Sequence, residues 1–189
     1  MLTGAVLAGG RSLRYGRNKA LEVFRGERLV DRAVGALRKY CSPVFLVAND
    51  LAPYLDVGAN LIRDIVSFQG PLGGVYTALL FSPNPWVAVR ATDMPLFVPG
   101  MLEGMLRLSA GGVDVVVPRS GDKYEPLFAL YHRRCIPAIA DALEGPRRDV
   151  IGFFAKVRVK HFEEEEWRRL DPAGLSFRNV NTPEDWSDL

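Results

Sequence analysis

The chain has 189 residues, of which 48% are hydrophobic and 24% are charged, and its formal net charge is +2. This balance is ordinary for a globular protein, and so small a net charge gives no reason to expect nucleic-acid binding. No apolar stretch approaches the roughly 20 residues of a membrane span, so no membrane association is expected.

We expect residues 1–189 to form a single domain. The first residues lack the basic start and apolar core of a signal peptide, which predicts a cytoplasmic location. Cys41 and Cys135 fit neither a disulfide framework nor a zinc site, and both are predicted to be reduced and packed.

Residues 5–21, AVLAGGRSLRYGRNKAL, combine a short buried strand with a glycine turn and a cationic loop. Gly9 and Gly10 allow the backbone to approach an anion closely. A lysine supplies a mobile point charge for phosphate oxygens, and arginine can add bidentate contacts. The loop therefore suits a nucleoside triphosphate, although it matches neither the Walker A nor the dinucleotide pattern. A surface turn with solvated charges is the open alternative. The cations are Arg11, Arg14, Arg17 and Lys19.

Strands and helices alternate through the next hundred residues. The pattern predicts helices over 28–40, 75–81 and 99–108, and strands over 44–48, 61–64, 86–92 and 113–117. Such alternation indicates βαβ units and a mostly parallel sheet, and these sheets bind ligands at the carboxyl ends of their strands. The polar residues at these ends could each be plain turn formers, but together they favour a site. They are Gly9, Asn49, Asp64 and Asp93.

The second half of the chain is less regular. It predicts strands over 126–131 and 157–161, helices over 136–143 and 149–154, and a helix start in the acidic run 163–166. Residues 177–185 are expected to form a last strand that leads into a helix capped by Thr182.

Several motifs, taken together and in order, resemble the molybdenum cofactor guanylyltransferase family. The first is Leu7-Ala8-Gly9-Gly10-Arg11-Ser12 with Arg14, Gly16, Lys19 and Leu21. The others are Gly70-Pro71-Leu72-Gly73-Gly74, Asp93-Met94-Pro95, Glu125-Pro126-Leu127 and Asn179-Val180-Asn181-Thr182-Pro183-Glu184. The match spans nearly the whole chain.

The resemblance implies a three-layer αβα fold of the nucleotide-diphospho-sugar transferase type. It also implies transfer of GMP from GTP to the terminal phosphate of molybdopterin, with Mg²⁺ as cofactor. Lys19, supported by Arg14, would contact the triphosphate, and Asp93 would hold the metal. Transient contacts with cofactor-delivery or acceptor proteins are also expected. The GTP-binding residues that it implies are Leu7, Ala8, Gly9, Lys19, Asn49, Asp64 and Asp93.

Asn179 and Asn181 alternate on the expected last strand, so their side chains would share one face. Two amides beside a helix N-terminus suit a polar heteroaromatic ligand with a phosphate, which describes molybdopterin. Alternatively, Asn181 stabilises the turn and Asn179 is simply exposed. Arg147 and Arg148 could meet the acceptor phosphate or could form a solvated pair.

One position departs from the family pattern. Many members carry an acid before the loop lysine, where this chain has Asn18, which leaves Lys19 without an adjacent carboxylate. The alternatives are a related cytidylyl- or sugar-phosphate nucleotidyltransferase and a non-catalytic nucleotide-binding domain. His132 and His161 are predicted to be structural, because a phosphate nucleophile needs no general base.

Overall fold

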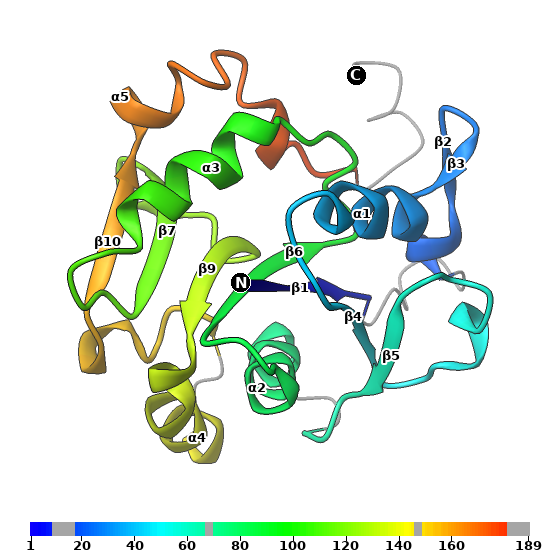
Figure 1. The fold of residues 1–189 in the computed structure, drawn as a ribbon, viewed down its shortest axis with the longest axis horizontal. Coiled ribbons are helices and arrows are strands. Elements are labelled where there is room, and N and C mark those ends of the chain that lie inside the picture. Colours follow the sequence, from blue (N-terminus) through cyan, green and yellow to red (C-terminus); the bar gives the residue numbers. More distant parts are fainter. Residues whose placement is uncertain (9–17, 67–69, 146–148, 181–189) are drawn as a thin grey trace.

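The computed structural model describes residues 1–8, 18–66, 70–145 and 149–180. The main strands are β1 (Leu2–Leu7), β4 (Val44–Ala48), β5 (Asn60–Arg63), β6 (Trp86–Ala91), β7 (Val115–Ser120), β8 (Lys123–Tyr124), β9 (Phe128–His132) and β10 (Val159–Glu163). They form one sheet in the order β10-β7-β9-β6-β1-β4-β5, with β8 paired to β7 (Figure 1). Strand β1 is parallel to β4 and β6, and β4 is parallel to β5. Strand β10 is parallel to β7, whereas β9 runs antiparallel to β6 and β7. The main path of the sheet therefore has more parallel than antiparallel pairs, as predicted.

Helices cover both faces of this sheet. They are α1 (Leu29–Arg38), α2 (Pro71–Phe81), α3 (Pro99–Leu108), α4 (Ile136–Glu144) and α5 (Glu164–Trp167). Helices α1 and α3 lie on one side, and α2 and α4 lie on the other (Figure 1). This is the expected three-layer αβα arrangement. In the part of the chain that the structure describes, no helix is long and apolar enough to cross a membrane.

Alternate residues of the central strands supply the two halves of the core. Val6 of β1 packs toward α1 and α3, whereas Ala5 and Leu7 pack toward α2 and α4. All of β4 is buried because both of its faces are covered, which explains why it reads as an unbroken apolar run.

Polar groups at the start of β1 are satisfied internally at the amino edge of the sheet. The buried Ser82 Oγ lies 2.7 Å from Thr3 Oγ1 and 2.8 Å from the carbonyl oxygen of Asn84. Asn84 Nδ2 also donates to Thr3 Oγ1, at 3.1 Å. Because Leu2 already pairs with Trp86 of β6, β1 begins earlier than the predicted strand.

Short elements complete the described chain. The 3₁₀ helices are η2 (Lys19–Leu21), η3 (Ala52–Tyr54), η4 (Arg133–Cys135), η5 (Phe154–Lys156) and η6 (Leu175–Phe177). A small hairpin joins β2 (Val23–Phe24) to β3 (Glu27–Arg28), and φ is positive at both of its turn residues, Arg25 and Gly26. The sequence pattern did not predict this hairpin.

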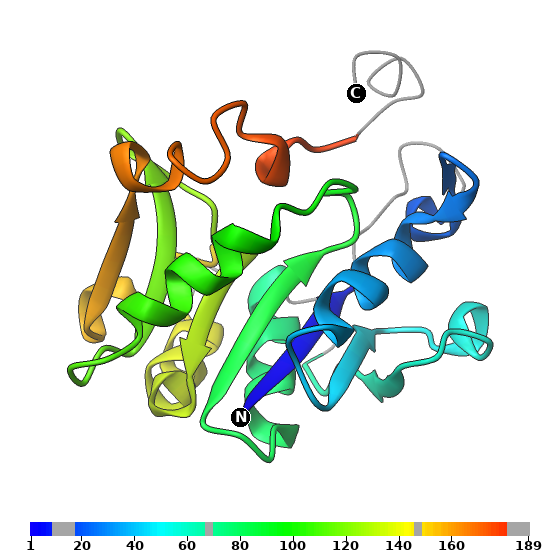
Figure 2. The same ribbon diagram turned by 45° about the horizontal axis from the view of Figure 1, so that its top comes forward.

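Two predicted elements are wrong. Turns followed by η5 replace the helix expected over 149–154. The described part of the last predicted strand, up to Val180, joins no sheet. The Asp171 carboxylate accepts hydrogen bonds from the backbone N–H groups of Leu175 and Ser176 at 2.9 and 2.8 Å, and both residues belong to η6, which ends at Phe177. Figure 2 shows the chain from α5 to η6 running above the strand ends.

Candidate active site at the carboxyl edge of the sheet

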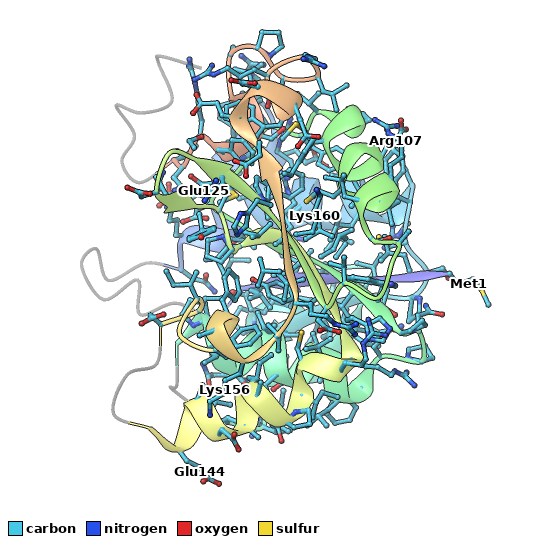
Figure 3. All side chains as sticks on the ribbon, turned by 90° about the vertical axis from the view of Figure 1, so that its left-hand side faces the viewer. Met1, Arg107, Glu125, Glu144, Lys156 and Lys160 are labelled. Atoms are coloured by element: carbon cyan, nitrogen blue, oxygen red, sulfur yellow. The ribbon has the colours of Figure 1, made fainter. Side chains whose placement is uncertain are left out.

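Four parallel strands end on one edge of the sheet, as the sequence predicted. This edge lies opposite Met1, and Glu125 marks it in Figure 3. Ala8, Asn49, Asp64 and Asp93 follow β1, β4, β5 and β6 at this edge. The sheet therefore collects residues that are far apart in the sequence.

A pocket of about 170 Å³ opens between the ends of β1 and β6. Its described lining combines an apolar wall with one cation and one carboxylate, which suits a ligand that is partly apolar and strongly charged. The described lining residues are Leu7, Ala8, Asn18, Lys19, Ala20, Pro71, Ala91, Thr92, Asp93 and Leu127.

Lys19 and Asp93 face each other in this pocket. Lys19 Nζ lies 3.5 Å from Asp93 Oδ2, and their side chains are 24% and 34% exposed. An ion pair of this length and exposure is weak, so each group can turn toward a charged ligand at small cost. The structure thus brings together the two residues that the sequence favoured for phosphate and metal.

Arg90 holds the loop that carries Asp93. Its Nη2 donates to the carbonyl oxygens of Met94 and Leu96, and its guanidinium lies 5.0 Å from the ring centre of Phe97 and 5.1 Å from that of Phe128. Burial lowers the pKa of Arg90 to about 9, while the charge of Asp93 acts in the opposite direction. The sequence prediction missed this residue, although an arginine within an apolar strand was a visible signal.

Leu127, the last residue of the Glu125-Pro126-Leu127 motif, forms the wall of the pocket beside β6. Leu127 O accepts a hydrogen bond from the N–H of Ala91 at 3.0 Å, and Tyr131 Oη donates to Pro126 O at 2.7 Å. These two bonds place Leu127 against the end of β6, where it lines the pocket.

Asn49 and Asp64 reach the same edge but are not among the described residues that line the pocket. Asp64 is buried, and its Oδ1 accepts hydrogen bonds from the Thr77 hydroxyl at 2.7 Å and from the N–H of Val66 at 3.1 Å. In this conformation Asp64 therefore links the end of β5 to α2. Roles for Asn49 and Asp64 in nucleotide binding remain predictions.

The C-terminal segment reaches the site through its backbone. The N–H of Val180 donates to Asp93 O at 2.8 Å, and the neighbouring Asn179 is exposed. Gly9, Arg14 and Asn181, together with Arg147 and Arg148, lie outside the described residues. The expectation that Asn179 and Asn181 share the face of a strand is wrong for its described part, because residues 178–180 belong to no strand.

The chemistry of the pocket fits a magnesium ion. Mg²⁺ prefers oxygen ligands and is usually held by one or two carboxylates together with phosphate oxygens and water. Asp93 offers one accessible carboxylate beside a pocket large enough for phosphate. No cluster of three or more acidic, histidine or cysteine side chains occurs within the described ranges, and this mode of binding requires none.

An αβα fold that brings Lys19 of η2 together with Asp93, which follows β6, at its carboxyl edge fits the class of nucleotidyltransferases. The chain belongs to the MobA-like NTP transferase domain family, whose model matches residues 4–159.

Relatives support this assignment over nearly the whole chain. A probable molybdenum cofactor guanylyltransferase from Pelotomaculum thermopropionicum is 38% identical over 97% of this chain and 89% of its own length. The molybdenum cofactor guanylyltransferase of Desulfosudis oleivorans is 33% identical over 97% of this chain and 92% of its own length.

Solved structures agree with the fold. The molybdopterin-guanine dinucleotide biosynthesis protein A of Archaeoglobus fulgidus has a TM-score of 0.84 and 26% identity, covering 98% of this chain and 95% of its own. The 2-C-methyl-D-erythritol 4-phosphate cytidylyltransferase of Thermus thermophilus has a TM-score of 0.68 and 16% identity, covering 97% and 94%. The latter likeness concerns the fold alone.

Proposed function

We propose that this protein transfers GMP from GTP to the terminal phosphate of molybdopterin and releases pyrophosphate. The observation that carries the proposal is the meeting of Lys19 and Asp93 at 3.5 Å in a pocket between β1 and β6. The names of the relatives favour guanylyl transfer to the molybdenum cofactor, and the name of the Archaeoglobus fulgidus protein favours molybdopterin as the acceptor.

In this reaction an oxygen of the acceptor phosphate attacks the α-phosphorus of GTP. A new P–O bond forms as the bond to the bridging oxygen breaks, and the electron pair leaves with pyrophosphate. Such transfers depend mainly on positioning and on neutralising charge. The acceptor phosphate is already ionised at neutral pH, so no histidine base is needed. Neither His132 nor His161 is among the described residues of the pocket.

The donor side of the proposed site comprises the ends of β1, β4, β5 and β6. Lys19, supported by Arg14, would bind the triphosphate, and Asp93 would hold Mg²⁺. The metal, when bound, neutralises charge on the phosphate oxygens. The remaining proposed GTP contacts are Leu7, Ala8, Gly9, Asn49 and Asp64.

The acceptor side of the proposed site comprises Asn179 and Asn181. The hydrogen bond from Val180 to Asp93 supports this placement, because it holds Asn179 close to the proposed metal ligand. We also propose that residues 1–189 act as one domain in the cytoplasm and meet cofactor-delivery or acceptor proteins transiently.

The test is a reaction of the purified protein with Mg²⁺, molybdopterin and each nucleoside triphosphate, followed by pyrophosphate release and by mass analysis of the product. GTP is expected to exceed CTP by at least about tenfold in catalytic efficiency, equal to about 1.4 kcal/mol. Equal or better use of CTP would assign the protein to cytidylyl transfer. Turnover with sugar phosphates instead would reject the acceptor, and nucleotide binding without turnover would reject catalysis.

A further inference from the structure

A buried tyrosine is hydrogen-bonded to two residues of the pocket without lining it. Tyr54 is the last residue of η3, which follows β4, and only 2% of its surface is exposed. Its hydroxyl oxygen lies 3.2 Å from Ala8 O and 2.9 Å from Asn18 Nδ2. Ala8 and Asn18 both line the pocket, and they flank residues 9–17, which lie outside the described ranges.

The groups around the Tyr54 hydroxyl determine which atom donates and which accepts in each hydrogen bond. The N–H of Ala20 donates to Asn18 Oδ1 at 3.2 Å, which orients the amide so that its Nδ2 donates to the phenol. The phenol has a single proton, which it can donate to Ala8 O. Asn18 Oδ1, at 3.1 Å, is a second acceptor for the same proton. A continuous chain of hydrogen bonds thus joins the first turn of η2 to the end of β1.

Both ends of this chain are anchored elsewhere in the fold. The N–H of Ala8 donates to Val47 O at 3.0 Å, which fixes the end of β1 to β4. On the other side, Asn18 O accepts from the N–H of Leu21 at 3.0 Å and so closes η2 around Lys19. Burial raises the pKa of the Tyr54 phenol, although the hydrogen bond from Asn18 acts in the opposite direction. The hydroxyl therefore keeps its proton at neutral pH.

We propose that Tyr54 is a positioning residue for the nucleotide site, because its hydroxyl fixes Ala8 relative to Asn18 and thereby presents Lys19 to the triphosphate. This inference rests on the proposed function and extends it to a residue that does not touch the ligand. It also gives Asn18 a role. An aspartate at position 18 has no N–H to donate, so it would compete with Ala8 O for the single phenolic proton.

The first test needs no ligand and compares two variants that each lose one buried hydroxyl. Tyr54→Phe keeps the packing of the ring, and Ser82→Ala removes a hydroxyl from the amino edge of the sheet. Tyr54→Phe is expected to speed amide hydrogen exchange at Ala20 by about tenfold, because the Asn18 amide loses its anchor. Ser82→Ala should leave the exchange of Ala20 unchanged. Unchanged exchange in Tyr54→Phe, or equal acceleration in both variants, would overturn the positioning role.

The second test measures GTP binding by calorimetry and then steady-state kinetics. Tyr54→Phe is expected to raise the dissociation constant for GTP about tenfold, while the KM for molybdopterin stays unchanged. Asn18→Ala should have a similar effect, and the double variant should be no worse than Asn18→Ala alone, since both break the same link. Additive effects would show that the two residues act independently and would reject the link.

The outcomes separate this inference from the proposed function. Failure of the wild-type protein to bind GTP would reject the function, while the exchange of Ala20 would still decide whether Tyr54 holds Asn18 in place. Normal GTP affinity in Tyr54→Phe, with the wild type binding well, would reject the positioning role alone. Should Tyr54→Phe unfold at a lower temperature than Ser82→Ala, GTP binding by Asn18→Ala, a variant at an exposed position, and by the double variant decides the question: no further loss in the double variant supports the link, and an additive loss rejects it.

Discussion

Lys19 is partly exposed, so its contribution to stability should be small compared with its contribution to catalysis. We expect Lys19→Ala to lower kcat/KM by about two orders of magnitude or more, equivalent to about 3 kcal/mol of transition-state stabilisation. The free energy of unfolding should change by less than about 0.5 kcal/mol. Pyrophosphate release and urea unfolding provide the two measurements. Lys160→Ala is the control, because Lys160 is exposed on β10 (Figure 3). Near-normal turnover in folded Lys19→Ala would remove Lys19 from the mechanism.

At Asp93, a single substitution can change the charge of the side chain without changing its shape. Asp93→Asn keeps the size of the side chain and removes the charge that a magnesium ligand needs. We expect turnover to be lost and raised Mg²⁺ to restore only part of it. The measurement is the dependence of the rate on Mg²⁺ concentration at saturating GTP. An active variant with the wild-type dependence would show that another residue holds the metal.

Among the secondary-structure elements, the packing of α3 against β10 depends on one glycine. A Cβ atom at Gly104 would lie 2.7 Å from Phe162 Cζ and 3.0 Å from Leu170 Cδ1. We therefore expect Gly104→Ala to lower the free energy of unfolding by about 1–3 kcal/mol. Gly35 in α1 is the matched control, because its Cβ would meet no described atom within 4 Å. Gly35→Ala should stabilise by up to about 1 kcal/mol, through helix propensity alone. Equal effects of the two substitutions in urea unfolding would contradict the close contact.

A buried carboxylate connects β7, η4 and β10 at the amino edge. Asp114 Oδ1 accepts from Arg134 Nε at 2.5 Å, and Oδ2 accepts from the backbone N–H of Arg158 at 3.0 Å. Burial alone would raise the pKa of Asp114, but the hydrogen bonds from Arg134 and Arg158 outweigh it and lower the pKa to about 2.

The low pKa of Asp114 makes its contribution to stability depend on pH. An unfolded aspartate titrates near about 3.9, so this contribution is complete above that pH and is lost as the pH falls toward about 2. We expect Asp114→Asn to lower the free energy of unfolding by about 1–3 kcal/mol at pH 7. The difference from wild type, measured by urea unfolding, should narrow progressively below pH 4. A difference that stays constant down to pH 2 would contradict the role of the charge.

For the molecule as a whole, the sequence predicted the elements whose signal is local. The strand over 44–48 and the helix over 99–108 have the predicted bounds, because burial on both faces and amphipathic spacing leave a clear pattern. The prediction of a last strand was wrong in its described part, because the alternation of side chains along the sequence does not show which groups the backbone bonds to. The backbone N–H groups of Phe177 and Arg178 donate to the nearby carbonyl oxygens of Gly174 and Leu175, and that of Val180 donates to Asp93 O, so none of the three joins a sheet.

In the candidate site, too, the residues with a local signal could be predicted and a residue that acts through distant partners could not. Lys19 could be predicted as the lysine that closes a glycine-led loop, and Asp93 as the acid that follows an apolar strand. Tyr54 could not, because its hydroxyl acts on Asn18, 36 positions away, and on Ala8, 46 positions away. Only the adjacency of β1 and β4 in the sheet brings these residues together. Residues proposed to contact the ligand are thus easier to predict from the sequence than a residue proposed to position them.

At the scale of the whole molecule, the proposed donor site draws on the N-terminal half of the chain, and the proposed acceptor site draws on its C-terminal end. The hydrogen bond from Val180 to Asp93 is the described backbone contact between them. If the two sites are separate, Asn179→Ala and Asn181→Ala should each weaken molybdopterin binding about tenfold, through the loss of hydrogen bonds to the pterin. GTP affinity should stay near normal. Fluorescence quenching measures pterin binding, and calorimetry measures GTP binding. Arg178→Ala is the control, because Arg178 is exposed next to Asn179 and belongs to neither proposed site. A variant that loses GTP affinity and keeps pterin affinity would place this segment on the donor side, and GMP transfer would then require an acceptor site elsewhere on the carboxyl edge.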